Sequence, residues 1–291
     1  MSLIPDQPDS PRACLLPTRR GDGERSPIKL VAIDLDGTLL NDSKQVSDRT
    51  VDALRCLGGQ GVRTVIASAR PPRSVRHIYE KLGLDTWTIN YNGALIWDEQ
   101  TRRVVYHQPM DADVVREIID RARAAFADVL VGCEVLDRWY TDRVEQAYTT
   151  ETGRMFKPDG VMPLEQFCNQ PITKLLLLGD PRRLRALVEP VFYDYPQVSA
   201  VRADPELIQV MDRRASKAAA LRLVAGHYQV PMEHVMAIGD AANDVGMLEV
   251  AGVAVAMDNA HPTVKSVAHW VAPSNNDHGV HAALVRYGLC T

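Results

Sequence analysis

No run of apolar residues in the 291-residue sequence is long enough to cross a lipid bilayer. An excess of positive charge is also missing, because 33 lysines and arginines stand against 37 acidic residues and leave a net charge of −4. A protein that binds nucleic acid usually presents a basic surface. The sequence therefore predicts neither a membrane protein nor a nucleic-acid partner.

Cysteine is scarce and shows no paired spacing. The five cysteines are scattered over the chain, and none forms a Cys-x-x-Cys pair. An odd number without such spacing argues against a disulfide framework and against a structural zinc site. We therefore expect a reducing compartment and a cytoplasmic location.

The segment 1–27 differs from the rest of the chain, because it is polar and carries five of the 18 prolines. Its only apolar patch is Cys14-Leu15-Leu16, which is too short for the core of a signal peptide. This composition predicts a disordered leader.

Short apolar runs alternate with helical patterns on both sides of the middle of the chain. The strands predicted from these runs are Leu30–Ile33, 63–67, 86–91, 94–97, 235–238 and 253–256, and the predicted helices are 47–57, 72–82, 216–225 and 244–251. Alternating strands and helices predict an α/β fold, a doubly wound and mostly parallel sheet with helices on both faces.

Residues 109–211 break this alternation. The segment predicts helices at 113–127 and 182–191 and strands at 129–135, 172–178, 198–202 and 207–211. Pairs of strands between helices indicate an α+β unit on an antiparallel sheet. We therefore expect a discontinuous core domain, 28–108 and 212–291, with an inserted domain at 109–211.

Polar side chains follow three of the predicted core strands. Asp34 and Asp36 follow the first, Ser68 follows the second, and Asp240 and Asp244 follow the third. Carboxyl ends of parallel strands lie at the same edge of a sheet, where ligands bind. Four carboxylates gathered there repel one another unless a cation lies between them, and oxygen ligands suit Mg²⁺. The sequence therefore predicts a Mg²⁺ site that also accepts a phosphate group.

The same residues predict phosphoryl-transfer chemistry. A metal-bound carboxylate such as Asp34 can attack phosphorus and form an aspartyl-phosphate. Asp36 could hold a proton and give it to the leaving oxygen. Ser68 can donate a hydrogen bond to phosphate, and the ammonium of Lys217 offsets negative charge. We expect a small phosphorylated metabolite as the substrate.

These spacings resemble the four motifs of the haloacid dehalogenase superfamily. The matching residues are Asp34-Leu-Asp-Gly-Thr-Leu-Leu40, Ser68, Lys217 and Gly239-Asp-Ala-Ala-Asn-Asp244. Asn92-Gly93-Ala94, Met257–Ala260 and Asn276–Val280 resemble further elements of its Cof-like phosphatases, which carry a type IIB cap. The resemblance covers the chain from about residue 28 to its end, and it identifies the inserted segment as the cap.

The resemblance also implies a role for each motif residue. Asp34 would be the nucleophile and a metal ligand, and Asp36 would be the general acid/base and ligate the metal through its backbone carbonyl. The other implied roles are phosphoryl binding by Ser68 and Lys217, metal binding by Asp240, support of the metal shell by Asp244, and a place near the phosphoryl group for Asn243. Two positions differ from the usual pattern, because Ala69 and Ala241-Ala242 stand where the family has Gly and Gly-Glu.

Several alternatives stay open. Asn92 is either a turn former or a substrate contact, and Asn243 is either a site residue or a helix cap. Arg70 and Arg73 are interpreted as solvated loop residues rather than substrate ligands. Sugar phosphates lead the expected substrates. The functional alternatives are a phosphotransferase or phosphomutase with the same intermediate, and a non-catalytic phosphate-binding module.

Overall fold

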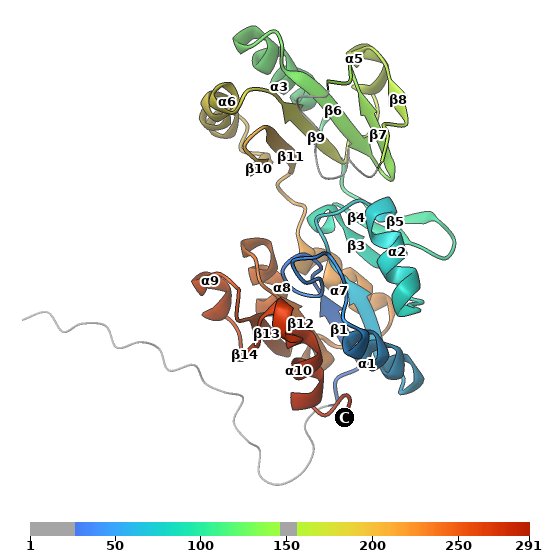
Figure 1. Ribbon diagram of the computed structural model, residues 1–291. Helices are drawn as coiled ribbons and strands as arrows, with labels where there is room; N and C mark the ends of the chain where they lie inside the picture. The colour runs from blue at the N-terminus through green and yellow to red at the C-terminus, as the bar shows by residue number, and fades with distance from the viewer. Residues whose placement is uncertain (1–26, 146–155) are drawn as a thin grey trace, which may run out of the picture.

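The computed structural model describes residues 27–145 and 156–291, so the predicted leader lies outside the described residues except for Pro27. A parallel five-stranded sheet forms the core, with the order β14-β13-β12-β1-β2 (Figure 1). Its strands are β1 (Leu30–Ile33), β2 (Arg63–Ile66), β12 (Val235–Gly239), β13 (Val253–Met257) and β14 (Trp270–Ala272). The predicted parallel sheet is thereby confirmed, and β14 is a strand that the sequence did not predict.

Helices cover both faces of this sheet. They are α1 (Asp48–Gly59), α2 (Pro72–Leu82), α7 (Lys217–His227), α8 (Val245–Val250), α9 (Pro262–Lys265) and α10 (Gly279–Arg286). The chain passes from β1 through α1 to β2 on one side, and from β12 through α8 to β13 on the other. Because such crossovers are right-handed, these two helices lie on opposite faces, which gives the doubly wound arrangement.

A small antiparallel sheet continues the core beyond β2. It contains β3 (Thr88–Asn90), β4 (Leu95–Asp98) and β5 (Arg103–His107), and a parallel bridge between Ala67 and Ile89 joins it to the core. The one-turn 3₁₀ helix η1 (Tyr91–Gly93) connects β3 to β4 and contains the predicted Asn-Gly turn. The sequence did not predict β5, because its side chains are mostly exposed and give no apolar alternation.

A second sheet of six strands, here called the cap with its helices, lies at the other end of the molecule (Figure 1). Its order is β10-β11-β9-β6-β7-β8, antiparallel except for the β7–β8 pair. Its elements are α3 (Ala112–Ala125), β6 (Leu130–Val135), β7 (Arg138–Thr141), β8 (Gly160–Val161), α5 (Leu164–Phe167), β9 (Lys174–Leu178), α6 (Pro181–Asp194), β10 (Val198–Asp204) and β11 (Leu207–Asp212). The exact domain limits stay a prediction.

The core domain and the cap each have their own hydrophobic interior, as expected for two units that fold around separate cores. All four residues of β1 are fully buried in the first core. In the second core, Ile118 of α3 packs with Val131 and Leu175 of the cap sheet. Within the described part of the chain, every helix is too short or too polar to span a membrane.

Candidate active site

The strands β1 and β12 are neighbours from which the chain continues in opposite directions, and this places a crevice at their carboxyl ends. The parallel pairing extends one residue beyond β1, because Asp34 N donates to Ile238 O at 3.0 Å. On the other side, Ala67 N donates to Ile33 O at 2.9 Å, so Ser68 lies at the same edge. The three polar strand ends that the sequence singled out therefore do meet.

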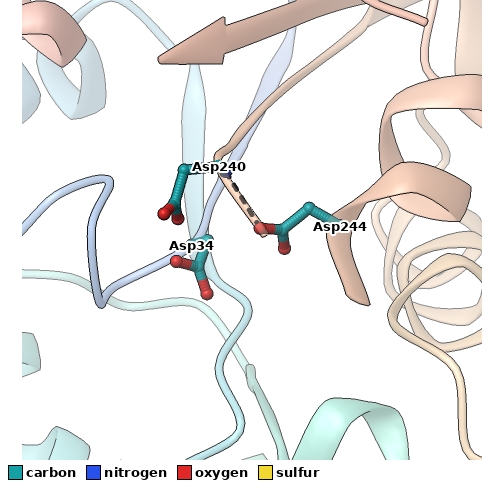
Figure 2. Close-up of side chains that lie close together, drawn as sticks. All are labelled: Asp34, Asp240 and Asp244. Carbon is teal, nitrogen blue, oxygen red and sulfur yellow. Dashed lines mark hydrogen bonds between the residues drawn. The ribbon is translucent and has the colours of Figure 1, made fainter. Parts of the chain in front are cut away.

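Three carboxylates form an acidic cluster in this crevice. Asp34, Asp240 and Asp244 each offer an oxygen, and these oxygens lie within 4.8 Å of one another (Figure 2). Hard carboxylate oxygens at this spacing fit a divalent ion such as Mg²⁺. The carboxylate of Asp36 does not belong to the cluster, and ligation through its backbone carbonyl stays a prediction.

Asp244 is fully buried, and both of its oxygens are already engaged. Its Oδ2 accepts hydrogen bonds from the backbone N–H groups of Asp240 and Ala241, both at 3.0 Å (Figure 2 shows the first). Its Oδ1 accepts from Nζ of Lys217 at 2.8 Å. Asp244 therefore fixes the backbone that carries Asp240, and this leaves Asp34 and Asp240 better placed to contact an ion.

Lys217 is the first residue of α7, and only 1% of its surface is exposed. Its Nζ donates to Asp34 Oδ1 at 2.6 Å as well as to Asp244. Burial lowers the pKa of this ammonium, but the charges of the two carboxylates outweigh burial and hold the pKa above its ordinary value. The lysine thus stays charged beside the predicted nucleophile, although a lysine at a helix start is normally solvated.

The crowded acids are costly to ionise without a cation. Burial, with the charges of Asp244 and Asp240 adding to it, raises the pKa of Asp34 to about 7, although Lys217 opposes the shift. Burial likewise raises the pKa of Asp240 to about 6, against a hydrogen bond of 2.9 Å from Thr38 Oγ1. An added divalent cation would favour the ionised form of both groups.

Asp36 lies in an ion-paired environment instead. Arg70 donates to both of its carboxylate oxygens at 2.6 Å, and Nζ of Lys44 donates to Oδ1 at 2.6 Å. Burial raises the pKa of Asp36, but these hydrogen bonds and charges prevail and the net pKa lies below the ordinary value. The sequence predicted that Asp36 carries a proton and acts as general acid. In this arrangement, the ion pairs with Arg70 and Lys44 favour the deprotonated carboxylate.

The interpretation of Arg70 and Arg73 as solvated loop residues is wrong. Their side chains are only 13% and 9% exposed, and each pairs with a carboxylate: Arg70 with Asp36, and Arg73 with Glu134 at 3.0 Å. The sequence could not show this, because both partners come from other parts of the chain. The signal that was present is the position of Arg70 two residues after Ser68.

The predicted phosphate and substrate residues also gather here. Ser68 is 1% exposed, and its Oγ accepts a hydrogen bond of 3.1 Å from Arg70 N. Asn92 N donates to Ser68 O at 3.0 Å, and Asn243 Nδ2 donates to Asn92 Oδ1 at 2.8 Å. Asn92 also adopts a left-handed conformation with φ 54°, so it forms the turn and lies at the site. Asp244, not Asn243, accepts the backbone hydrogen bonds at the start of η3 (Ala242–Asp244).

Asn259 also lies at the site, at a position that the sequence motifs did not assign to a function. Its Nδ2 donates to Gly37 O at 2.8 Å, and its Oδ1 accepts from Asn275 N at 3.0 Å. The side chain therefore ties the loop after β1 to the C-terminal segment. The motif 257–260 marked this turn, but spacing alone did not indicate what the asparagine contacts.

Comparisons with known proteins identify the family of the chain. A model of the haloacid dehalogenase-like hydrolase family matches residues 31–284. Phosphatase YwpJ of Bacillus subtilis is 32% identical, with 87% of this chain and 97% of that protein covered. The 5-amino-6-(5-phospho-D-ribitylamino)uracil phosphatase YitU of the same organism is 29% identical, with 89% and 97% covered.

Solved structures share the arrangement of core and cap. A haloacid dehalogenase-like hydrolase from Bacteroides thetaiotaomicron has a TM-score of 0.80 at 26% identity, covering 89% of this chain and 98% of its own. The subclass IIB sugar phosphatase BT4131 has a TM-score of 0.73 at 20% identity, covering 90% and 100%, a likeness of fold. The chain therefore belongs to the haloacid dehalogenase-like hydrolase family and is a phosphatase of its Cof-like group, with a subclass IIB cap.

Proposed function

We propose that the protein uses Mg²⁺ to hydrolyse a small phosphorylated metabolite, with a sugar phosphate favoured, through an aspartyl-phosphate on Asp34. The observation that carries the proposal is the buried carboxylate of Asp34, which lies in the acidic cluster and accepts a hydrogen bond of 2.6 Å from Lys217. A carboxylate that shares a site with a metal ion and a fixed cation can approach a negatively charged phosphate.

The charges of the described side chains suit a phosphate dianion. Four carboxylates, those of Asp34, Asp36, Asp240 and Asp244, stand against the three cations Lys44, Arg70 and Lys217. One Mg²⁺ brings this set to a net charge of about plus one, and a phosphate dianion then brings it to about minus one. A single proton neutralises the assembly, which is the proton that a leaving oxygen needs.

The reaction would proceed in two displacements. A carboxylate oxygen of Asp34 forms a bond to phosphorus as the bond to the leaving oxygen breaks, and the leaving oxygen takes up a proton. Water then attacks phosphorus and gives a proton to the carboxylate of Asp36, while the bond between phosphorus and the Asp34 oxygen breaks, so that inorganic phosphate leaves and the Asp34 carboxylate is restored. Mg²⁺ at Asp34 and Asp240 would supply charge neutralisation between carboxylate and phosphate.

Asp36 would supply the proton only after its ion pairs change. A bound phosphate brings negative charge near the carboxylate and competes for the hydrogen bonds of Arg70 and Lys44. Both effects raise the pKa of Asp36, so substrate binding itself would prepare the general acid.

The relatives inform the choice of substrates to test. Two Bacillus subtilis proteins, YitU and YcsE, each 29% identical to this chain, are phosphatases of 5-amino-6-(5-phospho-D-ribitylamino)uracil. That ester lies on a ribityl chain, which is a polyol and chemically close to an open-chain sugar. We therefore propose sugar and polyol phosphates, met in the cytoplasm, as the substrate class.

The test is phosphate release from sugar phosphates, 5-amino-6-(5-phospho-D-ribitylamino)uracil and pyridoxal phosphate, with Mg²⁺ or with EDTA. We expect Mg²⁺-dependent release by the wild type and none by Asp34→Asn, with circular dichroism showing that the variant is folded. Release by the variant would remove Asp34 as nucleophile. Transfer of phosphate to an added acceptor, without free phosphate, would instead indicate a phosphotransferase.

A further inference from the structure

Two charged residues are buried side by side in the cap sheet, at positions where apolar residues are usual. Glu134 on β6 and Lys174 on β9 are direct partners in the strand pairing and are 4% and 3% exposed. Buried charges are unfavourable unless they are paired and hydrogen-bonded. The partners of these two residues therefore indicate why the cap carries them.

Those partners come from the core. Nζ of Lys174 donates to Ala69 O at 3.1 Å and lies 4.9 Å from the centre of the Tyr91 ring. Glu134 accepts hydrogen bonds from the hydroxyl of Tyr91 and from Nη2 of Arg73, the latter at 3.0 Å. These hydrogen bonds join the cap to the segment that follows β2, to α2 and to the turn η1.

The carbonyl that Lys174 holds belongs to a peptide group in the site. The same planar unit that carries Ala69 O also carries Arg70 N–H, which donates to Ser68 Oγ at 3.1 Å. Because the peptide unit is rigid, a hydrogen bond that fixes its oxygen also fixes the direction of its N–H. The ammonium of the cap and the hydroxyl of Ser68 are therefore connected through one peptide group.

We propose that Lys174 is a positioning residue, by which the cap orients the Ser68 hydroxyl that binds the phosphoryl group. The inference rests on the proposed role of Ser68. Glu134 lies directly opposite Lys174 on the neighbouring strand, so its carboxylate brings a negative charge to the same face of the sheet. Since Lys174 is almost fully buried, it acts on the phosphate site and not on the leaving group of the substrate. The cap would then contribute to phosphate binding for every substrate. This contribution is separate from any part that the cap plays in selecting one substrate over another.

The main test compares Lys174→Met, Lys174→Gln and the control Lys157→Met, which removes an exposed lysine of the cap. Each variant is assayed with p-nitrophenyl phosphate and two sugar phosphates, with inorganic phosphate as inhibitor. We expect Lys174→Met to lower kcat/KM by about ten- to a hundredfold on all three esters, as misplaced binding groups do. Its inhibition constant for inorganic phosphate should rise as well. The amide of Lys174→Gln can donate to Ala69 O and should recover part of both losses, while Lys157→Met should match the wild type.

A double variant separates positioning from folding. Lys174→Met with Glu134→Gln removes the charges of both strand partners but weakens the ion pair of Arg73, which keeps the glutamine amide and Asp137 as neighbours, so the variant should stay folded with a lowered melting temperature while turnover stays low. An unchanged inhibition constant for inorganic phosphate in folded Lys174→Met would overturn the inference, as would losses that differ strongly among the esters, because these indicate contact with the leaving group. The variant Ser68→Ala separates a failure of the inference from a failure of the proposed role of Ser68.

If Ser68→Ala weakens phosphate binding and Lys174→Met does not, only the inference about Lys174 fails. If Ser68→Ala has no effect, the proposed role of Ser68 is refuted, and the inference about Lys174 is refuted with it.

Discussion

Gly37 lies against the carboxylate of Asp240 so closely that no side chain fits between them. A Cβ atom added there would lie 2.3 Å from Asp240 Oδ2, and the residue has φ +81°. We expect Gly37→Ala to displace Asp240, to weaken Mg²⁺ binding and to abolish most turnover. Isothermal titration with Mg²⁺, together with the phosphate assay, measures both effects.

Gly61 offers a matched control for this variant. It has a similar φ of +77°, but an added Cβ would meet no atom within 4 Å. Gly61→Ala should cost about 1 kcal/mol in the free energy of unfolding, from the left-handed backbone alone. Equal losses of Mg²⁺ affinity in the two variants would show that backbone strain, and not the contact with Asp240, is responsible.

The raised pKa values of two ligand candidates predict how Mg²⁺ binding depends on pH. The pKa values of Asp34 and Asp240 lie at about 7 and about 6, both above the ordinary value of 3.8. Below these raised pKa values, the two carboxyl groups of the metal-free protein carry protons that Mg²⁺ must displace. The affinity for Mg²⁺ should therefore rise with pH and level off above about pH 7. Titrations below pH 6 and above pH 7, repeated in buffers of different ionisation enthalpy, measure affinity and proton release. An affinity that is flat over this range would contradict the assignment.

At the scale of elements, Asn259 joins the turn that carries it to two other segments near the end of β1. Its hydrogen bonds to Gly37 O and from Asn275 N connect the turn after β13 with the loop after β1 and with the C-terminal segment. We expect Asn259→Ala to weaken Mg²⁺ affinity and lower turnover on the order of tenfold, as residues that orient metal ligands do. Because the side chain is exposed, the melting temperature should change little.

The neighbouring residue gives the control for this element. Asp258 lies on the same turn, is 69% exposed, and pairs with Lys265 across the surface at 3.1 Å. Such pairs contribute little, so Asp258→Ala should keep both turnover and Mg²⁺ affinity. If both variants lose activity alike, the turn as a whole matters and the contacts of Asn259 do not.

Residues that stand directly after strands could be placed from the sequence, because parallel strands align their carboxyl ends whatever the side chains do. Asp34, Ser68 and Asp240 are of this kind, and the alternating pattern was enough to bring them together. The ion pairs of Asp36 are of another kind, since Arg70 and Lys44 reach it from separate loops. Side-chain pairing across loops leaves no periodic signal, and β5 left none because its exposed residues lack alternation.

At the scale of the molecule, the cap and the core are two units joined near the site. We expect Mg²⁺ with orthovanadate, an analogue of phosphate, to favour the arrangement in which the cap covers the crevice. Small-angle scattering should then show a smaller radius of gyration than for the metal-free protein. Identical scattering profiles with and without these ligands would argue against a large closing motion.

The pairing of β1 with β12 also bears on how the chain is made. Leu30 lies beside Val235 in the sheet, so β1 can pair early with β2 on one side, whereas its other side stays unpaired until β12 has been synthesised. The cap strands lie between β1 and β12 in the sequence. They can pair while translation continues, because domains commonly fold as their segments emerge from the ribosome. We therefore expect a nascent chain in which the cap is folded while the core domain is still incomplete. Asp34 would meet Asp240 only after β12 has left the exit tunnel, so a product truncated before Asp240 would have no assembled metal site.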